Sequence, residues 1–163
     1  MASPVINLDT VTFDDIEDNG RYTSRRALFS EGIGARNLGY NLTIVPPGKV
    51  QCPFHAHRAE EEMFLILEGT GTLRFGKQTY PLRPLDVIAC PTGGAEVAHQ
   101  IINTGDVDLV YLAVSTLAQV EVCEYPDSGK VSVYAPGEHG LRHVFRTADE
   151  ADYYAGEAGT GDA

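Results

Sequence analysis

The sequence predicts an all-β fold, a sandwich or barrel built from short strands. From about residue 38 onward, short runs rich in β-branched and aromatic residues alternate with glycine and proline, with little helical periodicity between them. These runs lie at 40–45, 62–69, 71–76, 86–90, 99–104, 107–114 and 119–125. Evenly spaced short strands separated by turn residues are typical of β-sandwiches and β-barrels.

Glycine-containing segments supply the expected turns between these strands. EGTGT at 68–72 and FGKQT at 75–79 are interpreted as hairpin turns. Pro-Asp-Ser-Gly at 126–129 is a strong turn signal and predicts that the chain leads into a further strand. Residues 38–125 are therefore expected to form the barrel itself.

The two ends of the chain are less regular. Residues 1–37 mix charged and apolar side chains and are expected to form an N-terminal extension that packs on the barrel and supplies an edge strand. Residues 126–163 are expected to form a C-terminal extension with a frayed acidic tail, because the last 17 residues carry five carboxylates and no base. Thr147 and Glu150 have the spacing of a capping box and predict a short helix there.

The overall composition argues against several classes of partner. The 163-residue chain is 43% hydrophobic and 21% charged, as expected for one globular domain. Its net charge of −11 argues against nucleic acid and anionic membranes as partners. The amino end has no evident signal peptide, and the three cysteines, odd in number and without CxxC spacing, are expected to be reduced thiols. We therefore expect a cytoplasmic protein.

Two histidines, His55 and His57, are the first candidates for chemistry. Alternate residues of a strand point to one face, so these imidazoles would project into the same space. Positions two apart lie about 6–7 Å from each other along a strand, which allows both rings to hold one metal ion. The pair alone is weak evidence, since two surface histidines beside an acidic loop would give the same pattern.

A wider pattern around this pair resembles the two motifs of the cupin family and covers about residues 40–115. The first motif consists of glycine, HxH, glutamate and glycine, and the second of PxG, histidine and asparagine. The matching residues are Gly48, His55, His57, Glu62 and Gly69 in the first motif, and Pro91, Gly93, His99 and Asn103 in the second. The resemblance implies a double-stranded β-helix, a jelly-roll barrel, in which His55, His57, Glu62 and His99 bind one metal ion.

The sequence departs from the family pattern in three places. Six residues separate Gly48 from His55, Leu85 stands where the second motif begins with glycine, and five residues rather than two separate Gly93 from His99. The last departure matters because unmodified spacing would put Glu96 at the ligand position. We favour His99, since its interval to Asn103 is that of the motif and residues 99–104 have the pattern of a strand. The extra residues then lengthen a loop at the mouth of the barrel.

Three consecutive glutamates, Glu60–Glu62, compete for the remaining ligand position. Strand parity from His57 favours Glu61, but a turn between the two residues would reset the face. The six-residue interval to Gly69 favours Glu62. Glu61 is the runner-up, and Glu60 is interpreted as a solvated loop carboxylate.

Three imidazoles and one carboxylate leave open positions on a six-coordinate ion. Divalent Zn, Mn, Fe, Ni and Co all suit this set and are not distinguished by it. We expect a metal-dependent isomerase acting on a small sugar or sugar phosphate, in which the ion polarises a carbonyl or hydroxyl group. An Fe(II)-dependent dioxygenase and a non-catalytic small-molecule-binding protein are the alternatives. Few basic residues lie near the motifs to hold a phosphate: Lys49, Arg58, Arg74 and Lys77.

Four further residues are candidates for the pocket wall: Tyr40, Gln51, Arg74 and Tyr111. The two tyrosines could offer a hydroxyl to a substrate, although aromatic residues of a barrel more often belong to its core. Arg74 either enters the pocket or points outward to solvent, and Gln51 either lines the pocket or packs structurally. His139 and His143 are interpreted as surface histidines in a glycine-containing loop. A homodimer is expected, because cupins are commonly dimers.

Overall fold

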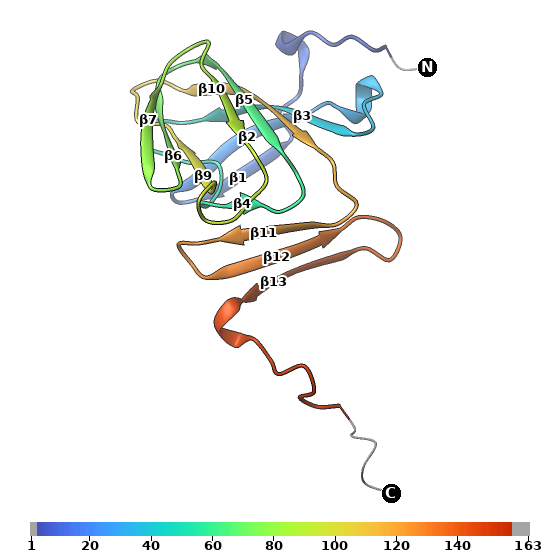
Figure 1. The fold of residues 1–163 in the computed structure, drawn as a ribbon. Helices are drawn as coiled ribbons and strands as arrows, with labels where there is room; N and C mark the ends of the chain where they lie inside the picture. Colours follow the sequence, from blue (N-terminus) through green and yellow to red (C-terminus); the bar gives the residue numbers. More distant parts are fainter. Residues whose placement is uncertain (1–2, 158–163) are drawn as a thin grey trace, which may run out of the picture.

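Two facing β-sheets enclose the core in the computed structural model, which describes residues 3–157 (Figure 1). Six strands form the first sheet. In spatial order they are β1 (Asp15–Asn19), β2 (Tyr22–Leu28), β3 (Leu38–Val45), β10 (Leu109–Thr116), β5 (Glu62–Glu68) and β8 (Val87–Cys90). All pairings in this sheet are antiparallel, which agrees with the predicted all-β class.

The second sheet consists of a three-stranded part and a four-stranded part. The three-stranded part has the order β7 (Gln78–Leu82), β6 (Gly71–Phe75), β9 (His99–Ile102), and the four-stranded part β4 (Ala56–His57), β11 (Glu121–Tyr125), β12 (Lys130–Ala135), β13 (Leu141–Arg146). A bridge between His55 and His99 joins the two parts. In Figure 1, β11, β12 and β13 form a layer below the barrel, with β13 farthest from it.

The seven strands expected from the sequence all form, and two of the three predicted turns are confirmed. The segment 75–79 joins the paired strands β6 and β7, and the segment 126–129 joins β11 to β12. The hairpin predicted at 68–72 is wrong, because β5 pairs with β10 and β8 whereas β6 pairs with β7 and β9. This segment instead carries the chain from one sheet to the other. Gly69 makes the crossing at φ +77, where an added Cβ would lie 2.4 Å from the carbonyl oxygen of Asp108.

Both extensions add strands to the sheets. The N-terminal one contributes β1 and β2, of which β2 pairs with β3 and β1 forms the edge. It also contains the short 3₁₀ helices η1 (Leu8–Thr10) and η2 (Glu31–Ile33). The C-terminal one contributes the hairpin of β12 and β13. The domain boundaries at 37 and 125 stay predictions, and the end of the predicted acidic tail, 158–163, lies outside the described residues.

The predicted capping box at Thr147 does not form. A three-residue 3₁₀ helix, η3 (Thr147–Asp149), occupies this place, with Arg146 in the N-cap position and no side-chain cap. The Thr147 hydroxyl donates to the carbonyl oxygen of Gly129 at 3.1 Å instead, which ties the end of β13 to the β11–β12 turn. Among residues 3–157, no helix is long and apolar enough to cross a membrane.

The core lies between the two sheets. Its members are Val45, Phe64, Ile66, Leu73, Leu82, Ile88, Cys90, Ile101, Leu109, Tyr111 and Ala113. Asn103, the asparagine of the second motif, is completely buried and has its amide fully used. Its Nδ2 donates to the carbonyl oxygens of Val45 (2.7 Å) and Val107 (2.8 Å), and its Oδ1 accepts from the N–H of Gly105 (3.0 Å). This satisfied side chain fixes the end of β9 against β3.

Within residues 3–157, Leu85 is the one residue other than glycine that has a positive φ (75°). It stands where the family pattern has a glycine, and its side chain is 79% exposed. The left-handed conformation costs a residue with a Cβ about 1–2 kcal/mol, part of which the entropy of glycine offsets. We therefore expect Leu85→Gly to raise the free energy of unfolding by about 0.5–1 kcal/mol, measured by urea denaturation.

The control is Leu85→Ala, which keeps the Cβ and the strained φ and removes only the exposed side chain. It should leave stability unchanged. Equal stability of the glycine and alanine variants would show that the backbone at this turn carries no strain.

Candidate metal centre

Three imidazoles converge because their strands pair at one point. The N–H of His55 donates to the carbonyl oxygen of His99 at 3.1 Å, and the N–H of His99 donates to that of His55 at 2.7 Å. Residues paired in this way point to the same face, so both rings enter the space between the sheets. His57 lies two residues beyond His55 and shares that face.

The fourth ligand comes from the opposite sheet. Glu62 is the first residue of β5, and its Oε2 lies 2.9 Å from Nε2 of His99, 3.3 Å from Nε2 of His57 and 3.9 Å from Nε2 of His55. Ligand atoms about 2.1 Å from one ion are roughly 3 Å apart at right angles and about 4 Å apart when opposite. The three distances fall in this range. Ligand atoms of His55, Glu62 and His99 all lie within 4.8 Å of one another and fit a single divalent ion, and His57 lies beside this group, 3.3 Å from Glu62.

Buried ring nitrogens without hydrogen-bond partners also support a metal ion at this place. Nδ1 of His55 lies 2.9 Å from the carbonyl oxygen of Pro53, to which it can donate, so that Nε2 keeps its lone pair. Both ring nitrogens of His57 and Nδ1 of His99 are buried without a hydrogen-bond partner. Buried polar atoms in this condition are costly, and coordination to one ion would satisfy one of them, Nε2 of His57.

The ionisation of the cluster also suits a cation. Burial alone would raise the pKa of the Glu62 carboxyl, but the neighbouring His57 and His99 imidazoles outweigh it and hold that pKa well below its usual range. Burial lowers the pKa of His99, against the attraction of the Glu62 carboxylate. The resting state at neutral pH therefore combines an ionised carboxylate with a neutral His99 imidazole, the forms in which both bind metals.

The other acidic candidates for the ligand position lie elsewhere. Glu61 is exposed. Glu96 is exposed too, and its Oε1 accepts from the N–H of Gly94 at 2.9 Å, within the lengthened loop. Glu60 is not the solvated loop carboxylate that the sequence suggests. It is half-buried in the cavity wall, and its Oε1 accepts from the N–H of Ala118 at 3.0 Å. Burial raises the pKa of the Glu60 carboxyl, although the Ala118 N–H opposes this.

Glu121, which the sequence did not single out, organises the turn between the ligands. It is 5% exposed, and its carboxylate accepts backbone N–H groups of Arg58 (2.9 Å), Ala59 (3.2 Å) and Glu60 (2.6 Å). Its Oε1 also lies 3.6 Å from Nδ1 of His57. Glu121 thus holds the turn that leads from His57 to Glu62, and it can orient the His57 ring.

A cavity of about 440 Å³ opens beside the four candidate ligands. Of the residues proposed for its wall, Gln51 and Tyr111 line it, and Tyr111 is 2% exposed. Tyr40 is outside the lining and packs near Phe29, with ring centroids 6.2 Å apart. Arg74 is also outside, because it forms two hydrogen bonds to Asp127 (2.5 and 2.8 Å) and covers the Phe54 ring. Of the two orientations considered for Arg74, the outward one is therefore observed.

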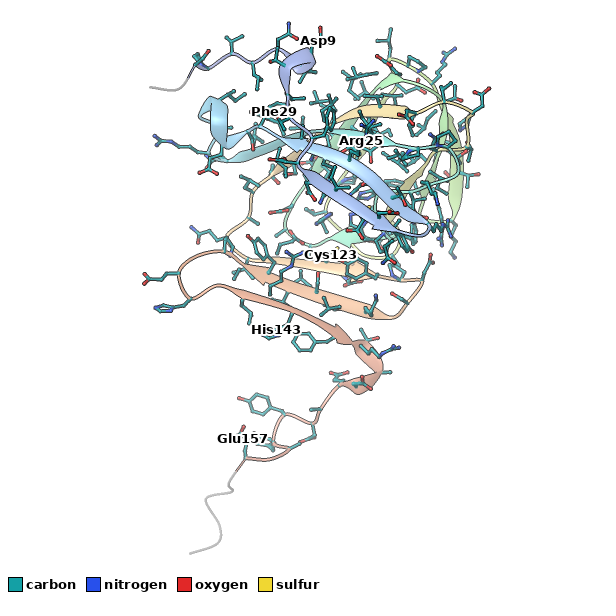
Figure 2. All side chains as sticks on the ribbon, turned by 180° about the vertical axis from the view of Figure 1, so that it is seen from behind. Asp9, Arg25, Phe29, Cys123, His143 and Glu157 are labelled. Atoms are coloured by element: carbon teal, nitrogen blue, oxygen red, sulfur yellow. The ribbon has the colours of Figure 1, made fainter. Side chains whose placement is uncertain are left out.

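Further wall residues come from strands whose pairing the sequence did not reveal. Cys123 (Figure 2) lies opposite His57 in the β4–β11 pairing, and its sulfur is within 4.8 Å of ring nitrogens of His55 and His57. Burial raises the pKa of Cys123 to about 12, as it does that of Cys52, so both thiols stay protonated and are poor ligands. Tyr125 stacks on the His55 ring with centroids 6.3 Å apart. The cysteines are free, in line with the reduced thiols expected.

The two C-terminal histidines contribute nothing to this cavity. His143 lies on β13, the outermost strand of the lower layer (Figure 2), so the loop predicted for it is wrong, whereas His139 lies in the loop before that strand. Both are exposed, as expected for surface histidines.

Comparison with known proteins identifies the central segment. Residues 41–115 match the family model described as Cupin domain. A structure from Acidithiobacillus ferrooxidans, provisionally named a sugar phosphate isomerase, superposes with a TM-score of 0.79 at 25% identity, covering 92% of this chain and 96% of the other. A sugar phosphate isomerase from Silicibacter pomeroyi, from a cupin superfamily, gives 0.78 at 23% identity, covering 90% and 94%.

A curated relative matches a shorter stretch. The oxalate-binding protein of Thermotoga maritima is 38% identical over 73 residues, which are 45% of this chain and 57% of the relative. The chain spans about half the length of the curated relatives that it matches.

The ligand assignment predicts which substitutions remove the metal. Glu62→Gln and His99→Ala should each weaken metal affinity by more than the roughly 10–100-fold that loss of an outer partner causes. Elemental analysis after dialysis measures the metal retained. Glu61→Gln and Glu96→Gln are the matched controls and should retain it, since both carboxylates are exposed. Full retention in Glu62→Gln and His99→Ala would refute the assignment.

Glu121→Gln should lower Co²⁺ affinity roughly tenfold while leaving the four ligands in place, because the neutral amide no longer offsets the charge of a His57-bound ion. Titration followed by the visible absorption of Co²⁺ measures this. Glu124→Gln is the control. Glu124 lies three residues after Glu121 on β11 and pairs with Arg58 outside the cavity. An unchanged Co²⁺ affinity and spectrum in Glu121→Gln would limit Glu121 to a structural role.

Proposed function

We propose that this chain, whose residues 41–115 match the family model described as Cupin domain, is a metal-dependent enzyme of the isomerase type acting on a small polar metabolite such as a sugar or sugar phosphate. The observation that carries the proposal is the convergence of three imidazoles and one carboxylate at the wall of a cavity of about 440 Å³. A bound divalent ion would polarise a carbonyl or hydroxyl group of the substrate.

Glu60 is the side chain best placed to move a proton. Its Oε1 accepts the Ala118 N–H, and within residues 3–157 no hydrogen bond engages its Oε2. The carboxylate lies within 4.8 Å of a His57 ring nitrogen and lines the cavity. Isomerisation between a carbonyl and the neighbouring hydroxyl requires a base beside the ion, and Glu60 has the position for it. Gln51 offers an amide in the same wall to orient the substrate.

The comparisons support the isomerase type because one of the similarities extends beyond the barrel. The similarity to the A. ferrooxidans structure covers 92% of the chain and so includes both extensions, which supply part of the cavity wall. The oxalate-binding relative matches only 45% of the chain. Its name favours a second candidate, a non-catalytic protein that binds a small carboxylic acid at the metal. Fold alone does not choose between these functions.

Glu60→Gln tests the proposal. On a panel of aldoses, ketoses and their phosphates, the metal-loaded wild type should interconvert at least one pair, and Glu60→Gln should reduce turnover by about 10²–10⁴-fold with metal content unchanged. Proton exchange with D₂O, followed by NMR, reports the step directly. Glu61→Gln is the matched control and should keep full turnover. Turnover in Glu60→Gln equal to that of the wild type would exclude this base.

Metal identity separates the remaining alternatives. Elemental analysis after anaerobic purification should find a metal that supports turnover without O₂. Bound iron together with O₂ uptake on candidate substrates would replace the isomerase by the Fe(II)-dependent dioxygenase. The cytoplasmic location and the homodimer stay predictions. For the homodimer, the exposed Phe145 on the outermost strand β13 offers apolar surface on the face opposite to Val144, which lines the cavity.

A further inference from the structure

The four basic residues nearest the sequence motifs are all directed away from the cavity. Nζ of Lys49 donates to the carbonyl oxygen of Gly20 at 2.7 Å. Arg58 pairs with Glu124, and Arg74 with Asp127. Lys77 borders a separate hollow beside Glu96. Any anionic group of a substrate must therefore find its positive partner elsewhere.

Two arginines from the extensions line the cavity instead. Arg26 lies on β2 of the six-stranded sheet, and Arg142 lies on β13 of the second sheet. Arg142 pairs with Tyr134 across the β12–β13 ladder, and Tyr134 pairs with Glu121. Cross-strand partners share a face, so Arg142 is on the face that carries Glu121. Two strand spacings place it about 10 Å from Glu121, at the outer end of the cavity.

The two guanidinium groups differ in their partners. Arg26 forms an ion pair with Asp15 at 2.6 Å. Arg142 has no carboxylate within 4.0 Å among residues 3–157, so its charge is uncompensated by the protein. A guanidinium offers a planar fork of donors that matches a carboxylate or phosphate. In a chain of net charge −11, an arginine without an acidic partner at the mouth of this cavity would attract an anionic ligand.

We propose that Arg142, with Arg26 at the facing wall, binds the anionic group of the substrate, a phosphate or a carboxylate, while the substrate's polar end reaches the candidate metal ligands. The substrate is then a small hydroxylated anion, and a cavity of about 440 Å³ is large enough to hold one. This inference rests on the proposed function and deepens it by naming the substrate class. Arg142 lies outside residues 41–115, so selectivity for the anion comes from the C-terminal hairpin.

The test uses three-carbon probes that differ only in charge: glycerol 3-phosphate, glycerate and uncharged glycerol. Calorimetry on the full metal-free chain, at fixed low ionic strength, measures binding without direct coordination of the anion to an ion. At least one anion should bind the wild type about tenfold more tightly than glycerol, and Arg142→Gln should lose about tenfold of that affinity. Arg142→Lys should lie between the two, since it keeps the charge but not the fork.

Arg146→Gln is the matched control. Arg146 lies on the same strand, is equally exposed and is outside the cavity lining, so its loss should change nothing. Tighter binding of glycerol 3-phosphate identifies a phosphate monoester, and tighter binding of glycerate identifies a hydroxy acid. Absence of anion binding by the wild type, or equal affinity in wild type and Arg142→Gln, would overturn the proposal.

Elemental analysis of the same samples, taken before the metal is removed, separates this result from the proposed function. A wild type without metal but with Arg142-dependent anion binding would defeat only the metal-dependent enzyme. A wild type that holds metal but binds neither anion would defeat only the anion site.

Discussion

The pairing of His55 with His99 is the contact on which both the barrel and the candidate site depend. Two main-chain hydrogen bonds join these residues and, through them, turn two strand groups into one sheet. The same bonds aim both imidazoles into the space between the sheets, because hydrogen-bonded partners share a face. Glu62 reaches this space only from the other sheet. The ligand set is therefore complete only when both sheets have assembled, which couples metal binding to folding.

Electrostatics explains why this cavity suits a cation. Glu60, Glu62 and Glu121 all lie in its wall, and none of the three is exposed. Burying carboxylates is unfavourable unless donors or charges compensate them. Glu121 is compensated by three backbone N–H groups, whereas Glu62 faces imidazoles, of which His99 is neutral at neutral pH. A divalent ion among the imidazoles would balance Glu62 and would satisfy Nε2 of His57, whose Nδ1 faces Glu121.

The sequence predicted those features that depend on local pattern or on motif spacing. The strands followed from composition, and the choice of Glu62 over Glu61 followed from the interval to Gly69, where parity along one strand pointed to Glu61. The sequence marked Leu85 only as a departure from the motif, and its positive φ came from the structure. The hairpin prediction for 68–72 was wrong because a glycine-rich segment has the same sequence pattern whether it closes a hairpin or connects two sheets.

The wall residues could not be predicted, because they depend on which strands pair. Glu121 and Cys123 enter the cavity only because β11 pairs with β4, and Arg142 only because β13 continues that sheet. Strand parity can say that Glu121 and Cys123 share a face but not which face is inward. The cupin motifs thus determine where an ion would sit, whereas the extensions form the outer part of the wall. In this architecture the ion can stay the same while a change in β2 or β13 alters which substrate charge the cavity accepts.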